Sequence, residues 1–108
     1  MCQEAGKRML AQGRGSIVNI GSIGGVSSLG RGQIAYFAAM GAVVQMVRGL
    51  ATEWASRGVR VNAILPAQVL NPGLSERIEK TPEVLDTFLR GIPAGRICLL
   101  YTSPSPRD

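Results

Sequence analysis

The sequence predicts an α/β fold built on a doubly wound parallel sheet, and three of its segments support this. Two short β-branched segments, "SIVNI" at residues 16–20 and "VRVNAIL" at 59–65, are typical of buried strands. Between them, residues 34–57 carry no charge over their first fourteen positions, as expected for a long helix. Strand, helix and strand form a βαβ unit with a right-handed crossover and parallel strands. Because both strands are largely apolar, we expect both faces of the sheet to be covered.

Flanking helices are predicted on each side of this unit. The first spans residues 2–12, before the glycines at positions 13 and 15. Residues 71–90 predict two short helices, with Pro72 and Pro82 in their first turns and Thr81 as a cap.

The long helix is predicted to be buried except for one polar stripe, and to end at Gly58. The stripe recurs at intervals of three and four residues and consists of Gln45, Arg48, Thr52 and Ser56. A packing face has the same helical spacing and consists of Val43, Val47, Leu50 and Trp54.

Composition excludes several classes of protein. The net charge of +5 comes mostly from singly spread arginines, which is weak support for nucleic-acid binding, so we expect no nucleic-acid partner. The longest uncharged run, residues 32–47, is shorter than the roughly 20 residues of a membrane span, and nothing resembles a signal peptide. We therefore expect no membrane association and a cytoplasmic location. Cys2 and Cys98 without any histidine predict reduced thiols and no metal site.

The tail, residues 98–108, breaks the pattern of the chain with two prolines among serines and no periodicity. One interpretation is a disordered terminus. We favour another, because these residues match, codon for codon, one reading frame of a transposase-type sequencing adapter. The native part of the chain is then residues 1–97, and 98–108 is a non-native tail.

Three residues from separate segments are predicted to converge at the carboxyl ends of the strands, where open α/β sheets bind ligands. Ser22 and Pro66 follow the two strands, and Tyr36 lies in the first turns of the intervening helix. A serine hydroxyl there can donate to a developing oxyanion, and a phenol can exchange a proton with an alcohol oxygen.

Position 40 lies one helical turn after Tyr36 and is occupied by methionine. A phenol has an ordinary pKa of about 10 and is a poor base at neutral pH unless a neighbouring cation favours the phenolate. A lysine at position 40 would supply that cation, whereas the thioether of Met40 has neither charge nor donor. Met40 is most simply a packing residue. A single base change from AAG to ATG, and so a sequencing or cloning error, is a second explanation.

The sequence resembles the short-chain dehydrogenase/reductase family over residues 2–96. "GRGSIVNIGSIGG" resembles the family's strand with its catalytic serine, "AYFAAMGAV" the Tyr-x-x-x-Lys helix, and "LATEWASRGVRVNAILPA" the next helix and strand. The resemblance implies a partial Rossmann-like domain at residues 1–97. It also implies an oxidoreductase that transfers hydride between NAD or NADP and a carbonyl or secondary alcohol substrate.

Residue by residue, the resemblance makes Ser22 the oxyanion-stabilising serine and Tyr36 the general acid/base, with Met40 at the lysine position. The segment "PAQVLN" lies where the family has Pro-Gly and then a threonine. Together with Tyr36, four of its residues are implied cofactor contacts: Pro66, Ala67, Val69 and Asn71. The small residues along residues 35–42 lie on the helix that the family pairs across subunits, which implies a homo-oligomeric parent protein.

The departures from the family pattern imply that this chain is an inactive fragment. The family's glycine-rich phosphate loop and catalytic asparagine would precede residue 1, and its last strand would follow residue 97. "GSIGG" leaves a strand but is not a dinucleotide-binding fingerprint. Met40 keeps a second hypothesis open, in which the protein is a non-catalytic relative that acts as a binding or assembly scaffold.

Overall fold

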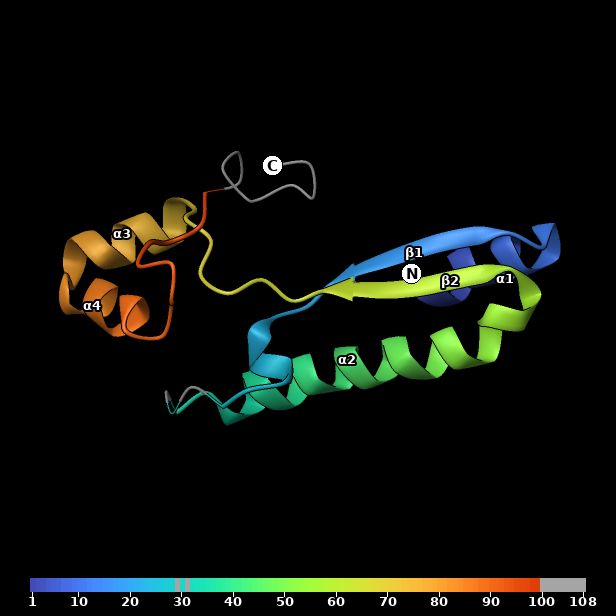
Figure 1. Ribbon diagram of the computed structural model, residues 1–108, viewed down its shortest axis with the longest axis horizontal. Coiled ribbons are helices and arrows are strands. Elements are labelled where there is room, and N and C mark those ends of the chain that lie inside the picture. Colours follow the sequence, from blue (N-terminus) through green and yellow to red (C-terminus); the bar gives the residue numbers. More distant parts are fainter. Residues whose placement is uncertain (29, 31, 100–108) are drawn as a thin grey trace. The chain divides into compact units, whose positions relative to one another are not determined.

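The computed structural model describes residues 1–28, 30 and 32–99, and it divides into two compact units (Figure 1). Unit 1 is Met1–Pro66 and unit 2 is Ala67–Asp108. In chain order, unit 1 contains α1 (Cys2–Gln12), β1 (Gly15–Ile20), a 3₁₀ turn (Ile23–Gly25), α2 (Ile34–Trp54), a second 3₁₀ turn (Ala55–Arg57) and β2 (Val59–Ile64). Unit 2 contains α3 (Pro72–Lys80) and α4 (Glu83–Leu89).

The predicted βαβ unit is confirmed. β1 and β2 pair in parallel, in a register that runs from Gly15 opposite Val59 to Ile20 opposite Ile64. The helical segment between them ends at Gly58, as predicted, where a φ of 81° requires glycine. A Cβ atom at Gly58 would also collide with the Gly13 carbonyl oxygen, so the two loops that enter the strands are packed directly against each other.

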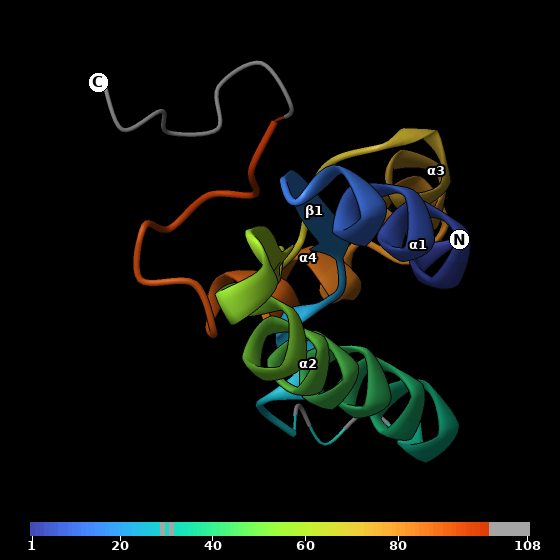
Figure 2. The same cartoon turned by 90° about the vertical axis from the view of Figure 1, so that its right-hand side faces the viewer.

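The core of unit 1 lies between the helices and one face of the sheet. Val47 of α2 and Val59 and Val61 of β2 form its buried centre, and Val59 is fully buried. Both helices contribute to it, α1 through Met9 and Leu10 and α2 through Leu50 and Trp54. Figure 2 looks along the strands of unit 1 and shows the two helices beside β1. The predicted packing face of the long helix therefore meets the sheet.

The prediction that both faces of the sheet are covered is wrong for the described residues. The residues that alternate with the core positions are exposed, and they include Val18 (54% exposed), Ile20 (67%) and Ile64 (54%). The reason is that α1 and α2 both pack against the same buried valines, which leaves the opposite face of the β1–β2 pair apolar and open to solvent.

Helix α2 is more exposed than the sequence predicted. Its polar stripe is exposed as expected, but Ile34 (80% exposed) and Met46 (41%) are exposed too. Residues 34–57 form a helical segment of 24 residues, long and apolar enough to cross a membrane by length and composition. The helical segment is therefore longer than the uncharged run of residues 32–47 on which the expectation of no membrane span rested. A core helix of a soluble protein and a signal sequence meet the same criterion, so length and composition alone do not identify a membrane span.

Unit 2 consists of two short helices and an extended segment. Val69 and Cys98 form an isolated parallel bridge, and α3 and α4 lie in the chain between them. The predicted helices are present, but the predicted Thr81 cap is wrong. Pro82 is the N-cap residue of α4, and its side chain has no polar atom to cap the helix. Thr81 is instead the C-cap residue of α3, where its amide donates to the Arg77 carbonyl oxygen.

Unit 2 also contains an open apolar hollow of about 690 Å³. The residues that line it come from α3, α4 and the segments that flank them: Leu70, Ile78, Leu85, Leu89, Gly95, Arg96, Ile97 and Leu99. Arg96 is the charged residue among those that line the hollow.

Candidate active site

The turn after β1 holds Ser22 in a defined orientation. Ser22 is the N-cap of the 3₁₀ turn, and its Oγ accepts a hydrogen bond from the Gly24 amide at 3.1 Å. The Gly25 amide donates to the Ser22 carbonyl oxygen at 2.9 Å. The first bond occupies a lone pair of Oγ and leaves the hydroxyl hydrogen available to donate to a ligand.

The loops that follow β1 and β2 are tied together at the carboxyl ends of the strands. The Gly21 amide donates to the Ile64 carbonyl oxygen at 2.9 Å, and the Ile23 amide donates to the Pro66 carbonyl oxygen at 3.1 Å. Pro66 therefore lies next to the turn that carries Ser22. Its carbonyl group has a structural role there that the sequence did not indicate.

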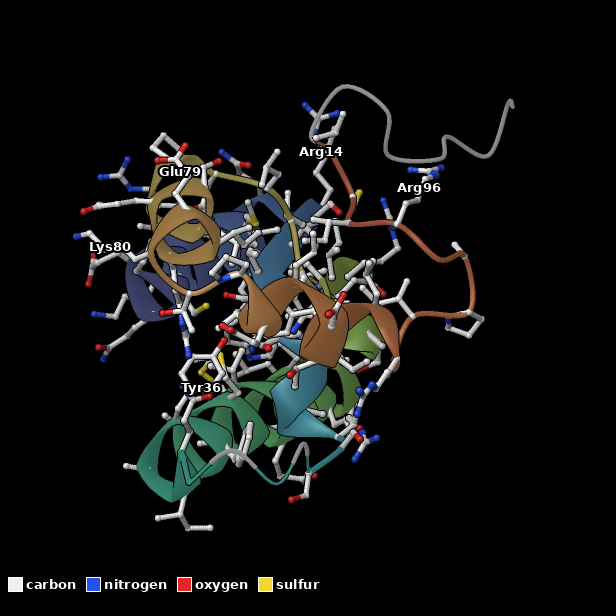
Figure 3. All side chains as sticks on the ribbon, turned by 90° about the vertical axis from the view of Figure 1, so that its left-hand side faces the viewer. Arg14, Tyr36, Glu79, Lys80 and Arg96 are labelled. Carbon is white, nitrogen blue, oxygen red and sulfur yellow. The ribbon has the colours of Figure 1, made fainter. Side chains whose placement is uncertain are left out.

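Tyr36 lies in the first turn of α2, and Figure 3 shows its side chain extending away from the helix. The residue is 47% exposed, and its ring meets that of Phe37 edge to face at a centroid distance of 6.1 Å. A Cβ atom on Gly24 would lie 3.4 Å from Cε1 of Tyr36. Gly24 therefore lies beside both residues: its amide is bonded to Ser22 Oγ, and a methyl group on its Cα would touch the Tyr36 ring.

Met40 is half-buried one turn further along α2. Its backbone carbonyl faces Gly25, on which a Cβ atom would lie only 2.6 Å from the carbonyl oxygen. In the part of the chain that the structure describes, the ion pairs are Lys7–Glu4 and Lys80–Glu76, both exposed and both within single helices. Neither places a cation beside Tyr36.

The other predicted cofactor contacts, Ala67, Val69 and Asn71, belong to unit 2. Asn71 is the N-cap of α3, and its Oδ1 accepts a hydrogen bond from the Leu74 amide at 2.9 Å. Its Nδ2 donates to the Val69 carbonyl oxygen at 3.4 Å. Sequence reasoning missed this capping role, although an asparagine directly before a proline is a typical start of a helix.

The turn "GSIGG" does not form a phosphate cradle. Such a cradle needs free backbone amides at a helix N-terminus. The amides of residues 23–27 are all hydrogen-bonded within unit 1, to the Pro66 carbonyl, to Ser22 or to the Ile23 carbonyl. The residues of this turn therefore fit a reacting oxygen but not a dinucleotide phosphate, and the rejection of a dinucleotide fingerprint is consistent with the structure.

Comparison with known proteins identifies the class. Residues 1–101 match the family model described as enoyl-(acyl carrier protein) reductase, and the chain belongs to the short-chain dehydrogenase/reductase family. Its α/β fold with a parallel sheet is that of Rossmann-like members of this family. A search of the curated proteins gave no match.

Solved structures of the same family superpose closely. A Beutenbergia cavernae protein described as an NAD(P)-dependent gluconate 5-dehydrogenase, with NADP bound at low occupancy, is 38% identical with a TM-score of 0.80. A Burkholderia xenovorans short-chain dehydrogenase/reductase is 33% identical (TM-score 0.82), and it aligns with 91% of this chain and 38% of its own. An Agrobacterium tumefaciens protein described as a 2-deoxy-D-gluconate 3-dehydrogenase, with bound NADP, is 33% identical (TM-score 0.76; 90% and 39% covered).

The chain therefore spans about two fifths of the length of these relatives. The alignment with the Beutenbergia cavernae protein, for example, covers 91% of this chain but 39% of that protein. Two of the three relatives were solved with NADP, the cofactor class that the sequence predicted. The family and its relatives are oxidoreductases.

Proposed function

We propose that the parent protein transfers hydride between NAD or NADP and a carbonyl or secondary alcohol, with Ser22 and Tyr36 at the reacting oxygen. The observation that supports this most is the place of Gly24, whose amide is bonded to Ser22 Oγ and on which a Cβ atom would lie 3.4 Å from Cε1 of Tyr36. This supports a site in which a hydroxyl donor and an exposed phenol act on one oxygen at the carboxyl end of β1, where α/β sheets bind ligands.

In the proposed reduction, the Ser22 hydroxyl donates a hydrogen bond to the substrate carbonyl oxygen and stabilises the negative charge that develops there. The Tyr36 hydroxyl gives its proton to the same oxygen, and the phenolate that remains is reprotonated from solvent. Oxidation of an alcohol runs through the same groups in reverse. The nicotinamide cofactor, when bound, supplies or accepts the hydride at the substrate carbon.

The parent protein must supply the phosphate-binding part of the cofactor site, because the described turn after β1 has its amides occupied. For that reason we expect residues 1–97 alone to be inactive.

We also propose that the parent is a cytoplasmic homo-oligomer that acts on a small molecule, and that α2 is a core and interface helix rather than a membrane span. The exposed residues of α2 are consistent with an interface.

A second function is favoured by one observation, the methionine at position 40. If it is native, the proton relay lacks its cation, and the protein is a non-catalytic relative that binds or assembles with a partner. An independently sequenced copy of the gene distinguishes a native Met40 codon from an error.

The activity is tested in a restored full-length domain, either from the parent gene or by grafting residues 1–97 in place of the matched segment of the Beutenbergia cavernae relative. Carrying Met40→Lys, this enzyme should turn over members of a panel of ketones and secondary alcohols with NADPH or NADP. Tyr36→Phe keeps the ring but removes the acid, and it should lower kcat at least about 10²-fold.

The matched control is Gln45→Ala, an exposed position on the same helix, which should leave kcat unchanged. A Tyr36→Phe enzyme with undiminished kcat would contradict the assignment. A restored domain that binds NADPH but turns over nothing, even with lysine at position 40, would support the scaffold instead.

A further inference from the structure

The glycine pair that follows Ser22 has an unusual packing environment. Gly24 is buried, and a Cβ atom there would lie 2.8 Å from Cδ1 of Phe37. A Cβ atom on Gly25 would lie 2.6 Å from the Met40 carbonyl oxygen and 2.9 Å from the Met40 carbonyl carbon. Contacts below 3.0 Å are essentially never made by real Cβ atoms, so a larger residue at either position requires a shift.

These glycines are not required by backbone conformation. Among the described residues, the glycines with positive φ are Gly13, Gly30, Gly32, Gly58 and Gly95, and the pair after Ser22 is not among them. An alanine would therefore adopt the same φ and ψ without strain. What excludes a side chain is the short distance between the turn and α2, so the pair sets how closely the turn approaches the helix.

The two positions differ in what would have to move. At Gly24 the obstacle is the Phe37 ring, a side chain that can rotate. At Gly25 the obstacle is a backbone carbonyl within α2, which can move only with the helix. Position 25 should therefore tolerate an added side chain less well than position 24.

We propose that Gly24 and Gly25 are positioning residues for the Ser22–Tyr36 pair, an inference that rests on the proposed function. The Gly24 amide fixes the Ser22 hydroxyl oxygen, and Gly25 seats the turn on α2 one helical turn from Tyr36. A methyl group at position 25 would lift the turn, and Ser22 with it, away from the helix that carries Tyr36. Displacement of a catalytic group by about 1 Å can cost about 10² in rate.

The test uses the restored full-length enzyme with Met40→Lys as the reference. Gly25→Ala should lower kcat by about 10- to 100-fold with little change in the KM for NADPH, because only the reacting oxygen loses its alignment. Gly24→Ala should have a smaller effect. The matched control is Gly49→Ala, which adds the same methyl group to α2 where nothing lies within 4 Å of it, and should stay within about twofold.

A double-mutant cycle separates positioning from a general loss of packing. In a Ser22→Ala background, Gly25→Ala should lower kcat by less than about threefold, because the hydroxyl group that it displaces is already absent. The same loss in both backgrounds, or an unchanged kcat for Gly25→Ala alone, would overturn the proposal. If the Gly25→Ala enzyme does not fold, the same double-mutant cycle with Gly24→Ala tests whether the glycine pair positions Ser22.

The outcome of Ser22→Ala alone keeps the two hypotheses distinguishable. If Ser22→Ala does not lower kcat, the proposed catalytic role of Ser22 fails, whatever the glycines do. If Ser22→Ala lowers kcat and neither glycine variant does, the proposed function stands and the positioning role is wrong.

Discussion

The two units of the chain differ in how completely their residues are packed and hydrogen-bonded. In unit 1, the amides of the turn after β1 are paired, the turn contacts α2 at Gly24 and Gly25, and Val59 is fully buried. In unit 2, α3 and α4 border an open apolar hollow of about 690 Å³, and Phe88 is the only buried residue among those that the structure describes there.

Under the proposed function, this difference fits a division of work between the two units of the parent protein. A proton-transfer site needs groups held within a fraction of an ångström, which a paired and packed turn provides. A region that selects substrates can remain open and apolar, with a few polar groups at its border. We therefore expect substitutions in unit 1 to alter chemistry or stability strongly, and substitutions in unit 2 to have smaller effects on stability.

The largest effect is expected for Met40→Lys in the restored enzyme. An ammonium one turn from Tyr36 favours the phenolate, and positioned acid/base catalysis contributes roughly 10² to 10⁴ in rate. Turnover at neutral pH should rise by up to that factor. The pH at which alcohol oxidation accelerates should also move toward neutral, because the added positive charge makes loss of the phenol proton easier.

Met40→Leu is the control for Met40→Lys, since it changes the side chain without adding charge, and it should leave the rate near that of the methionine enzyme. The measurement is the pH dependence of turnover for the three forms with one secondary alcohol. Equal rates and profiles for the methionine and lysine enzymes would exclude a proton relay on this face of α2.

The sequence predicted the elements of unit 1 well because local patterns determine them. The β-branched runs at 16–20 and 59–65, and the helical spacing between them, lie within one continuous βαβ segment. Gly58 was recognised because a helix that stops before a strand typically requires a left-handed residue. These features depend on neighbours a few residues apart.

The sequence predictions were wrong where the outcome depends on which helices and strands pack against each other. An apolar strand such as β1 indicates that both faces can be buried, but not whether this chain supplies the cover, so exposed Val18 and Ile20 were not anticipated. Likewise, the sequence "KTPE" predicts that Thr81 caps the start of α4, whereas Thr81 is the C-cap residue of α3. The contacts of Gly24 and Gly25 are equally non-local, because the sequence alone does not show how closely their turn approaches α2.

An intermediate effect compares a buried residue of unit 1 with a half-buried residue of unit 2 in the isolated chain of residues 1–108, which keeps Cys98 and Leu99 of unit 2. Val59→Ala removes two methyl groups from a fully buried side chain. It should lower the free energy of opening that protects the β1 and β2 amides from hydrogen exchange by about 2 kcal/mol. Ile78→Ala removes more atoms, but this side chain borders the open hollow. The free energy of opening for the α3 amides should therefore fall by less than about 1 kcal/mol.

Hydrogen exchange followed by mass spectrometry measures both units in one sample. Val18→Ala, on the exposed face of the sheet, is the control and should change protection little. A larger loss for Ile78→Ala than for Val59→Ala would show that the hollow is closed in solution, and the contrast between the units would not hold.

The smallest effect is expected at Asn71, where it separates two roles of one side chain. Asn71→Ala removes the cap on the Leu74 amide and should lower the local stability of α3 by about 1 kcal/mol. Asn71→Asp keeps an acceptor at the cap and adds a negative charge that suits a helix N-terminus, so it should retain that stability.

If Asn71 also contacts the cofactor phosphate, as the family resemblance implies, the same carboxylate would repel it. In the restored enzyme, Asn71→Asp should then weaken NADPH binding at least about tenfold while leaving α3 intact. Asn71→Ser, which retains a capping oxygen without charge, should bind NADPH nearly as well as the parent. Calorimetric titration with NADPH measures the binding and hydrogen exchange over residues 72–80 measures the cap. Equal affinities for the aspartate and asparagine enzymes would remove Asn71 from the cofactor site and leave it only the cap of α3.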